Sequence, residues 1–376
     1  MIKIREPLLL TPGPLTTSHT TKNALKKDWG SRDQAFINLT ENIRKKLLSL
    51  ANAQRDHVCI PMQGSGTFAI EAMLGTLIPR NGSVLVLING AYGERIANIL
   101  KVLGRTYRTI KFPSNEALDP TLINNALKSN KDITDVAMVH CETTSGVLNP
   151  LDEIAKLVSK NKCRLFIDAM SSFGGIPINA KYIAFDGLAA SANKCIECVP
   201  GVAFVLARKI HLEQCSANSH SLSLDLYDQW QGLQKNGQWR FTPPTQIIAA
   251  LDSALDQLND EGGIGFRFAR YWENCQVLIS GMKDIGFETY LPDETQAPII
   301  VTFIAPSDDT GFNFEKFYSI LAREGYLIYP GKLTTHNSFR IGCIGNIKAE
   351  DIQNLLIVVS NSLKEMNITL IANEIK

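Results

Sequence analysis

Two apolar strands that each end in a charged side chain constrain this chain more than any other feature. The first expected strand, 165–168, runs through apolar residues into Asp168, and the second, 187–191, consists of small residues and leads to Asn193 and Lys194. Apolar strands of this kind are typical of a parallel sheet that helices cover on both faces. Because such sheets bind ligands at the carboxyl ends of their strands, we expect Asp168 and Lys194 to meet there.

A carboxylate and an amine placed in this way are what pyridoxal 5'-phosphate chemistry requires. The lysine would attach the cofactor covalently, and the buried carboxylate would keep the pyridine nitrogen protonated so that the ring can accept electrons. Burial lowers the pKa of a lysine and frees its amine for proton transfer. Lys194 and Asp168 are therefore the predicted catalytic residues. Taken singly, Asp168 could also be a helix cap or a metal ligand, and Lys194 a surface lysine.

The remaining patterns predict an α/β fold with a mostly parallel central sheet and a smaller C-terminal α/β domain. In the first part of the chain, the expected strands are 58–61, 83–88, 136–140, 165–168, 187–191 and 202–206, and the expected helices are 38–50, 66–77, 94–103 and 151–159. After Thr245 the pattern changes. There we expect helices at 246–258, 265–282, 314–324 and 349–361, and strand-like segments at 299–303, 327–329 and 338–342.

These patterns suggest an N-terminal segment at 1–15, a large cofactor-binding domain at 16–259 and a small domain at 260–376. The residues from Ile368 onward are expected to form a loosely held tail. No internal repeat or low-complexity linker interrupts the pattern.

Composition narrows the class of protein. The chain has 376 residues, of which 45% are hydrophobic and 20% charged, and a formal net charge of +1, so neither nucleic acid nor an anionic membrane is an expected partner. Its longest apolar runs have the length of strands, and its N-terminus lacks the features of a signal peptide. Eight scattered cysteines include one close pair, Cys195 and Cys198, so we expect reduced thiols in a cytoplasmic enzyme and no metal site.

A glycine turn at Gly64–Thr67 opens the expected helix 66–77 and could hold a phosphate. Free backbone N–H groups and the helix dipole favour an anion at such a turn, and Ser65 and Thr67 add hydroxyl donors. The turn lacks the lysine of a P-loop and the spacing of a dinucleotide-binding motif. The stretch 331–335, which includes Lys332, also fails as a P-loop because no glycine-rich segment precedes it.

Three further side chains could face the same site. Tyr92 follows the strand 83–88 and could stack on a flat ring. It could equally be an aromatic residue at a loop–helix junction with no contact to a ligand. Thr144 follows the strand 136–140 and is our choice for a cofactor contact. Arg340 lies in an alternating strand, where arginine normally faces solvent, but it could also bind a carboxylate or phosphonate through two hydrogen bonds.

Together these stretches resemble the fold-type I pyridoxal-phosphate enzymes of the class V aminotransferase group. Within that group, their sequences resemble most closely those of the 2-aminoethylphosphonate:pyruvate transaminases. The Asp-Ala-Met-Ser-Ser-Phe-Gly run that begins at Asp168 and the Ser-Ala-Asn-Lys-Cys-Ile run that begins at Ser191 are specific. The Pro-Gly-Pro run at 12–14 and the Gly-Ser-Gly-Thr run at 64–67 mark only the wider group. The matching stretches cover nearly the whole chain up to about residue 365; they are 10–14, 28–33, 63–67, 89–95, 140–146, 167–174 and 191–196.

The resemblance implies a homodimer with active sites at the subunit interface. It implies transfer of the amino group of 2-aminoethylphosphonate to pyruvate, which gives phosphonoacetaldehyde and L-alanine in phosphonate degradation. Lys194 would then carry the cofactor, and Asp168 would pair with its ring nitrogen. The resemblance also implies that Ser65, Gly66 and Thr67 bind the cofactor phosphate and that Tyr92, Thr144 and Asn193 contact its ring. Trp239 and Thr242 would reach the cofactor of the partner subunit. Arg340 and Gly13 would bind the substrate.

One departure from the family wording concerns the residues after Lys194. The family usually reads Gln-Gly where this chain has Glu197-Cys198. We expect Cys198 to occupy a position where φ is positive and a side chain is unwelcome, and Glu197 to add negative charge near a site for dianions. Both changes would affect substrate affinity.

Three alternatives remain on the sequence alone. An alanine–glyoxylate or serine–pyruvate aminotransferase of the same group would share every cofactor residue. A cysteine desulfurase would need a cysteine on a mobile loop over the cofactor, and 331–338 contains none. A non-enzymatic descendant would be favoured by loss of Lys194 or Asp168, and both are present.

Overall fold

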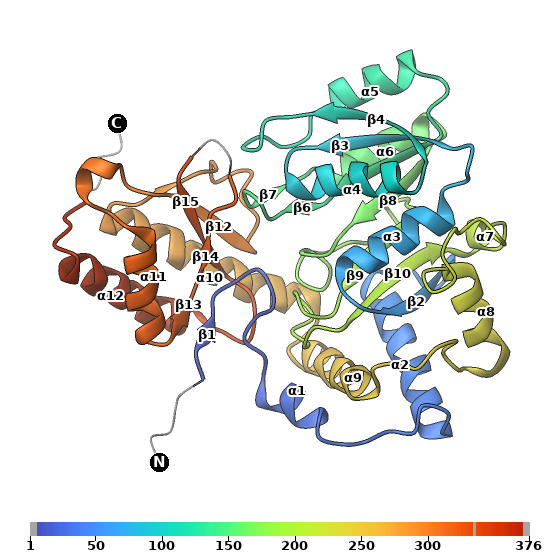
Figure 1. Cartoon of the computed structure of the whole chain (residues 1–376), viewed down its shortest axis with the longest axis horizontal. Helices are drawn as coiled ribbons and strands as arrows, with labels where there is room; N and C mark the ends of the chain where they lie inside the picture. The colour runs from blue at the N-terminus through green and yellow to red at the C-terminus, as the bar shows by residue number, and fades with distance from the viewer. Residues whose placement is uncertain (1–5, 334–335, 371–376) are drawn as a thin grey trace.

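A computed structural model of the chain describes residues 6–333 and 336–370, and it has two lobes of unequal size (Figure 1). The larger lobe contains a seven-stranded sheet in the order β2-β10-β9-β8-β5-β3-β4. Strand β10 pairs antiparallel with both of its neighbours, and the other pairs are parallel. The strands of this sheet are β2 (His57–Gln63), β3 (Ser83–Ile88), β4 (Thr106–Lys111), β5 (Asp135–Val139), β8 (Arg164–Asp168), β9 (Gly187–Ser191) and β10 (Val202–Arg208).

Helices cover both faces of this sheet. They are α1 (His19–Ala24), α2 (Gln34–Leu50), α3 (Gly66–Leu77), α4 (Ala91–Val102), α5 (Pro120–Ser129), α6 (Leu151–Lys160), α7 (Lys209–Leu212), α8 (Leu226–Asn236) and α9 (Thr245–Asp260). Helices α3, α4 and α8 share one apolar core with alternate strand residues, and α2, α5, α6 and α9 share the other. Coverage of both faces explains why inner strands such as β3, β5 and β9 read as continuous apolar runs.

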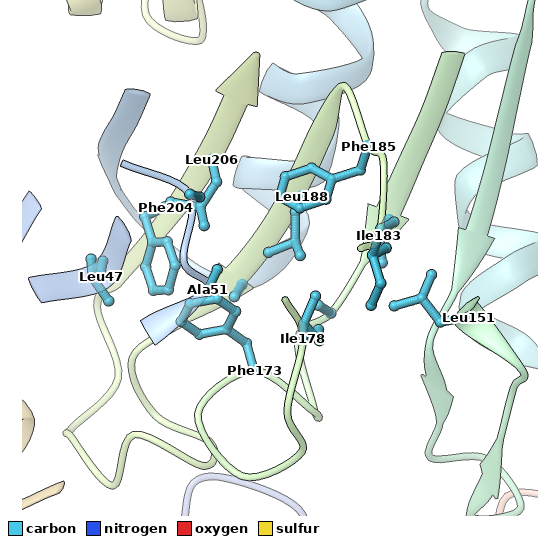
Figure 2. Close-up of a cluster of buried hydrophobic side chains, with 14 of the residues drawn as sticks. Leu47, Ala51, Leu151, Phe173, Ile178, Ile183, Phe185, Leu188, Phe204 and Leu206 are labelled. Carbon is cyan, nitrogen blue, oxygen red and sulfur yellow. The ribbon is translucent and has the colours of Figure 1, made fainter. Parts of the chain in front are cut away.

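The core on the α2 side is well packed around aromatic rings. Phe173 and Phe204 meet edge to face, with ring centroids 5.3 Å apart, and Leu188 lies nearby (Figure 2). Phe173 belongs to the turn that follows Asp168, so its burial fixes the chain immediately after the predicted catalytic carboxylate.

The smaller lobe is built on an antiparallel sheet in the order β11-β12-β15-β14. It comprises α10 (Ile264–Ile285), β11 (Glu288–Thr289), β12 (Ile300–Ile304), a 3-10 turn (Asp308–Thr310), α11 (Phe314–Arg323), β13 (Tyr326–Leu327), β14 (Tyr329–Pro330), β15 (Ser338–Gly342) and α12 (Ala349–Glu365). Near the N-terminus, β1 (Leu8–Leu9) pairs with β13, so this part of the chain joins the smaller lobe. A short hairpin of β6 (Cys141–Glu142) and β7 (Val147–Leu148) belongs to the larger lobe.

The predicted fold class is confirmed, with differences at particular elements. The expected strand 327–329 is two short strands, β13 and β14, and α1, β4, α5, α7 and α8 were not predicted. The expected loose tail from Ile368 is wrong at its start, because Ile368 is buried and Leu370 packs on the core of the smaller lobe. The rest of that tail and the first residues of the predicted N-terminal segment lie outside the described residues. Within the described ranges, no helix has the length and apolarity needed to cross a membrane.

Candidate active site

The predicted catalytic residues lie at the carboxyl ends of neighbouring strands. Strand β8 ends at Asp168, and β9 is followed by Asn193 and Lys194. Since side chains alternate along a strand, Asp168 lies on the same face as Phe166, which packs in the core beneath α3 and α4. The carboxylate therefore points toward the side of the sheet where the Gly64–Thr67 turn and Tyr92 are found.

These residues line one cavity of ≈ 480 Å³. It brings together the predicted site residues Ser65, Gly66, Thr67, Tyr92, Asp168, Asn193 and Lys194. It also contains residues to which the sequence analysis gave no role, among them Arg95, Met170 and Ser191. The cavity lies where the rule for open α/β sheets places a ligand.

Lys194 is half-buried in the wall of the cavity and contacts the N-terminal segment. Its Nζ donates to the carbonyl of Gly13 at 3.5 Å. Gly13 has φ +114, and a Cβ at that position would lie 2.7 Å from the carbonyl oxygen of Asn193, so a glycine is required. Burial lowers the pKa of the Lys194 amine, although nearby Tyr92 and Asp168 oppose the shift. A lowered pKa favours the neutral amine that nucleophilic attack and proton transfer need.

Asp168 is buried with one hydrogen bond to its carboxylate. The backbone N–H of Met170 donates to Oδ1 at 3.0 Å. Burial raises the pKa of Asp168 to about 6, and this hydrogen bond and the positive charges of Arg95 and Lys194 oppose the rise. A buried carboxylate in this position would be stabilised by a cationic partner such as a protonated pyridine nitrogen.

The Gly64–Thr67 turn leads directly into α3, as the sequence predicted. Ser65 is the N-cap residue, and its side chain makes no capping hydrogen bond. A Cβ on Gly66 would lie 2.5 Å from the sulfur of Met170, so a larger residue would displace the wall of the cavity. Arg95 donates from Nη1 to the Thr67 hydroxyl at 3.2 Å and adds positive charge beside the turn. The turn is thus suited to an anion at a helix N-terminus.

Tyr92 is held in place by a buried carboxylate that the sequence analysis left without a role. Glu142 accepts hydrogen bonds through Oε2 from the backbone N–H groups of Tyr92, at 3.0 Å, and Gly93, at 3.4 Å. It therefore satisfies free backbone N–H groups in the first turn of α4 and fixes the position of Tyr92 in the wall of the cavity. Glu142 follows a buried strand just as Asp168 does, and the same signal could have identified it.

Thr144 supports this arrangement and does not line the cavity. Its hydroxyl donates to Oε1 of Glu142 at 2.5 Å and accepts from the N–H of Ala91 at 3.1 Å. The structure thus places Thr144 at the start of α4, the helix that carries Tyr92. Its predicted contact with a cofactor stays a prediction.

Arg340 and the pair Trp239 and Thr242 also lie outside the cavity wall. Arg340 donates from Nη1 to the carbonyl of Thr143 at 2.8 Å and from Nε to the carbonyl of Pro330 at 3.1 Å, so it bridges the two lobes. Trp239 donates from Nε1 to the Thr40 hydroxyl at 3.2 Å. Together with Thr242 it lines a separate hollow of ≈ 330 Å³.

The expectation for Cys198 is wrong, because the positive φ belongs to the residue before it. Glu197 has φ 61, and Cys198 is absent from the described residues with positive φ. The negative charge that the sequence analysis expected from Glu197 is paired with cations in the structure. Its carboxylate accepts from the Tyr271 hydroxyl at 2.6 Å and pairs with Arg270 at 2.8 Å and with Arg267 at 3.6 Å. The charge is therefore neutralised on the α10 side.

The residues present fit pyridoxal phosphate. A lysine with a lowered amine pKa, a buried carboxylate and a glycine-containing turn at a helix N-terminus share one cavity. The buried Ser191 hydroxyl, which lines the same cavity, has no hydrogen-bond partner among the described residues. A bound group with polar atoms would satisfy it.

Comparison with known proteins agrees with this geometry. The model of the family "Aminotransferase class-V" matches residues 17–355. The chain is 49% identical to the 2-aminoethylphosphonate–pyruvate transaminase 2 of Burkholderia lata, over 98% of each protein. It is 50% identical to the 2-aminoethylphosphonate–pyruvate transaminase of Pseudomonas fluorescens strain Pf0-1, over 96% of this chain and 98% of that protein.

Solved structures of similar fold include enzymes with different substrates in their names. The pyridoxamine–pyruvate aminotransferase of Mesorhizobium loti has a TM-score of 0.90 at 24% identity, over 99% of this chain and 96% of that one. The alanine–glyoxylate aminotransferase of Nostoc sp. has a TM-score of 0.88 at 24% identity, over 96% of both chains. At this identity the likeness concerns the fold. The resemblance seen in the sequence motifs is confirmed, and the chain belongs to the class-V aminotransferase family.

Proposed function

We propose that this protein is a pyridoxal-phosphate-dependent transaminase that moves the amino group of 2-aminoethylphosphonate to pyruvate. The products are phosphonoacetaldehyde and L-alanine, so the enzyme acts in phosphonate degradation. The observation that carries the proposal is the single cavity that contains Lys194, Asp168 and the Gly66–Thr67 turn. The choice of substrates rests on relatives of that name that are about half identical over nearly the whole chain.

Lys194 is the residue of the cavity that moves protons in this reaction. Pyridoxal phosphate, when bound, supplies an electron sink for the carbon that bears the amino group. Lys194 holds the cofactor between turnovers. Once the amino donor has replaced it, the free Nζ amine removes a proton from the donor carbon next to nitrogen. In the second half-reaction, the same amine delivers a proton to the carbon that becomes Cα of L-alanine.

The surrounding residues hold the reactants in position. Asp168 would keep the ring nitrogen cationic, and Tyr92 would lie against the ring. Ser65, Gly66 and Thr67 would bind the phosphate, with Arg95 beside them. Asn193 and Thr144 would complete the cofactor contacts, and Gly13 and Arg340 would act on the substrate side. Arg340 suits an acidic group because guanidinium binds carboxylate and phosphonate through two parallel hydrogen bonds.

The proposal includes a cytoplasmic homodimer whose active sites lie at the interface. An exposed apolar patch of Phe68 and Phe241, which line one hollow, supports it, because Phe68 follows the Gly64–Thr67 turn directly. Trp239, which lines a hollow with Phe68 and Phe241, would reach the partner's cofactor together with Thr242. A patch of this kind is typical of an interaction surface.

Replacement of the lysine tests the proposal. Lys194→Ala should abolish formation of L-alanine from 2-aminoethylphosphonate and pyruvate, because no other group in the cavity combines a buried amine with access to the donor carbon. Alanine formation is measured with coupled assays, and Lys45→Ala, at an exposed position on α2, is the matched control. Full activity of Lys194→Ala would contradict the mechanism. If the enzyme used serine or alanine as amino donor in preference to 2-aminoethylphosphonate, the proposed donor would be wrong.

A further inference from the structure

The loop between β14 and β15 carries a lysine toward the active site. Strand β14 pairs with β15 so that Tyr329 lies opposite Arg340, and the N–H of Gly331 donates to the carbonyl of Ser338 at 2.8 Å. A Cβ on Gly331 would collide with the backbone and hydroxyl of Ser338, so only glycine allows this approach. Lys332 follows immediately, and its position is therefore set by the same hairpin that holds Arg340.

Lys332 reaches across to the larger lobe. Its Nζ lies 4.6 Å from the centroid of the Tyr92 ring, and Tyr92 lines the catalytic cavity. Arg340, from the same hairpin, reaches the carbonyl of Thr143 at 2.8 Å. Within the part of the chain that the structure describes, no carboxylate forms an ion pair with Lys332. Two cations from one hairpin thus reach the larger lobe, and Lys332, which lies against a residue of the cavity wall, is available to an anion.

The positive charges around Tyr92 divide into two groups. Arg95, whose guanidinium carbon is 4.8 Å from the centroid of the Tyr92 ring, is hydrogen-bonded to Thr67 and belongs to the phosphate turn. Lys332 and Arg340 come from the smaller lobe and reach Tyr92 and Thr143 of the larger lobe. A fully ionised phosphonate carries two negative charges and three oxygens, whereas a carboxylate carries one charge and two oxygens. One guanidinium matches a carboxylate, and a phosphonate dianion calls for a second cation.

We infer that Lys332 is the specificity-determining residue for the phosphonate group, and that its ammonium joins Arg340 in binding the dianionic end of the donor. This inference deepens the proposed function and rests on it. Arg340 alone would suffice for the carboxylate of pyruvate in the second half-reaction. Lys332 would therefore affect the two half-reactions unequally, although both use the same cavity.

Inhibition by unreactive anions tests this with the holoenzyme. Ethylphosphonate and propanoate have the same carbon chain length before the acidic group and lack an amine, so they report on the anion subsite alone. Lys332→Met should raise the inhibition constant of ethylphosphonate about 10- to 100-fold, the usual effect of losing a charged hydrogen bond, and that of propanoate less than about 3-fold. Lys332→Arg, which keeps the charge, should restore most of the ethylphosphonate binding. Lys45→Met on α2 is the matched control and should change neither constant.

The half-reactions give a second readout. With Lys332→Met, amination of the cofactor by 2-aminoethylphosphonate should need a much higher donor concentration, while reaction of the aminated enzyme with pyruvate keeps its concentration dependence. The difference should shrink as the pH falls below the second ionisation of the phosphonate. Equal weakening of both anions, or no weakening of either, would overturn the inference while wild-type turnover leaves the proposed function standing. A wild-type enzyme that does not aminate pyruvate from 2-aminoethylphosphonate would overturn both.

Discussion

At the scale of single residues, the site contains a carboxylate whose burial serves the reaction and opposes folding. The pKa of Asp168 in the folded protein is about 6, above its ordinary value of 3.8, chiefly because the side chain is buried. Between these two values the folded protein binds more protons than the unfolded chain. Stability without cofactor must therefore fall as the pH rises from about 4 through about 6. A cationic ring nitrogen beside the Asp168 carboxylate would lower its pKa again and so remove this loss of stability.

Asp168→Asn should therefore stabilise the cofactor-free protein at pH 8 and remove most of the transaminase activity. The difference between 3.8 and about 6 corresponds to about 3 kcal/mol, which is the upper limit of the gain at pH 8, and the gain should vanish below pH ~4. Urea unfolding of the cofactor-free variants at several pH values measures it. Asp119→Asn, at the half-buried N-cap of α5 where the side chain accepts from the N–H of Thr121, is a control with a different environment. A loss of stability at pH 8 that persists at pH 4 would contradict the argument.

At the scale of elements, the turn that carries Lys194 is clamped by helix α10 of the smaller lobe. The N–H of Glu197 donates to the carbonyl of Lys194 at 2.8 Å and closes the turn. Arg267 donates from Nη1 to the carbonyl of Cys195 at 2.8 Å, and the Tyr271 hydroxyl donates to Glu197. Arg270 binds Glu197 and also the carbonyl of Gly345 at 2.6 Å, beyond β15. The positive φ of Glu197 is thus compensated by contacts that join the lysine turn to α10.

Removing the Glu197 carboxylate should lower the stability of the fold strongly, whereas replacing Glu197 with glutamine, the residue usual in the family, should lower it less. Glu197→Ala leaves two partly or fully buried arginines with Glu261 as the remaining carboxylate of the cluster, so the free energy of unfolding should fall by about 3 kcal/mol. Glu197→Gln keeps an acceptor for Tyr271 and Arg270 and should cost about 1 kcal/mol. Chemical denaturation at pH 7 compares the two variants. Equal destabilisation by both would show that the acceptor geometry has no part in the clamp.

At the scale of the whole molecule, the two lobes meet beside the cavity, whose lining residues all come from the larger lobe. The larger lobe provides the cavity, and the hairpin of β14 and β15 brings Arg340 to Thr143 across the boundary (Figure 1). The apolar patch of Phe68 and Phe241 is exposed in a single chain, with 50% and 44% of these residues accessible. Residues of such size rarely stay in water together in a stable monomer, so the patch favours association with a second copy.

Phe241→Asp should weaken this association and with it the retention of cofactor. A charge in the proposed interface would have to be buried without a partner, so the variant should shift toward monomer at micromolar concentration. Analytical ultracentrifugation measures the shift, and absorbance of the bound cofactor after dialysis measures the retention. Ile357→Asp, at an exposed apolar position on α12, is the control and should stay associated. A monomeric wild type, or a fully associated Phe241→Asp variant, would contradict the proposed dimer.

The sequence by itself determined the parts of the protein that depend on local pattern. The strands β3 and β9 and the helix α3 lie at their predicted bounds, because their apolar runs are bounded by clear turn residues. Asp168, Lys194 and the Gly64–Thr67 turn share a cavity as expected, since the carboxyl ends of parallel strands lie on one edge of a sheet. Elements with a weak pattern were missed. Strand β4 is an edge strand with mostly exposed side chains, so its sequence lacks an apolar run.

The tertiary structure decided what depends on contacts between distant segments. The charge of Glu197 is neutralised by residues some seventy positions later on α10, and no local rule predicts that pairing. Thr144 turns toward Glu142 and away from the cavity because the start of α4 needs an acceptor there. Arg340 and Lys332 reach Thr143 and Tyr92 only because the smaller lobe packs against the larger one. Local pattern fixes which side chains a strand presents, and packing of the two lobes fixes which of them meet.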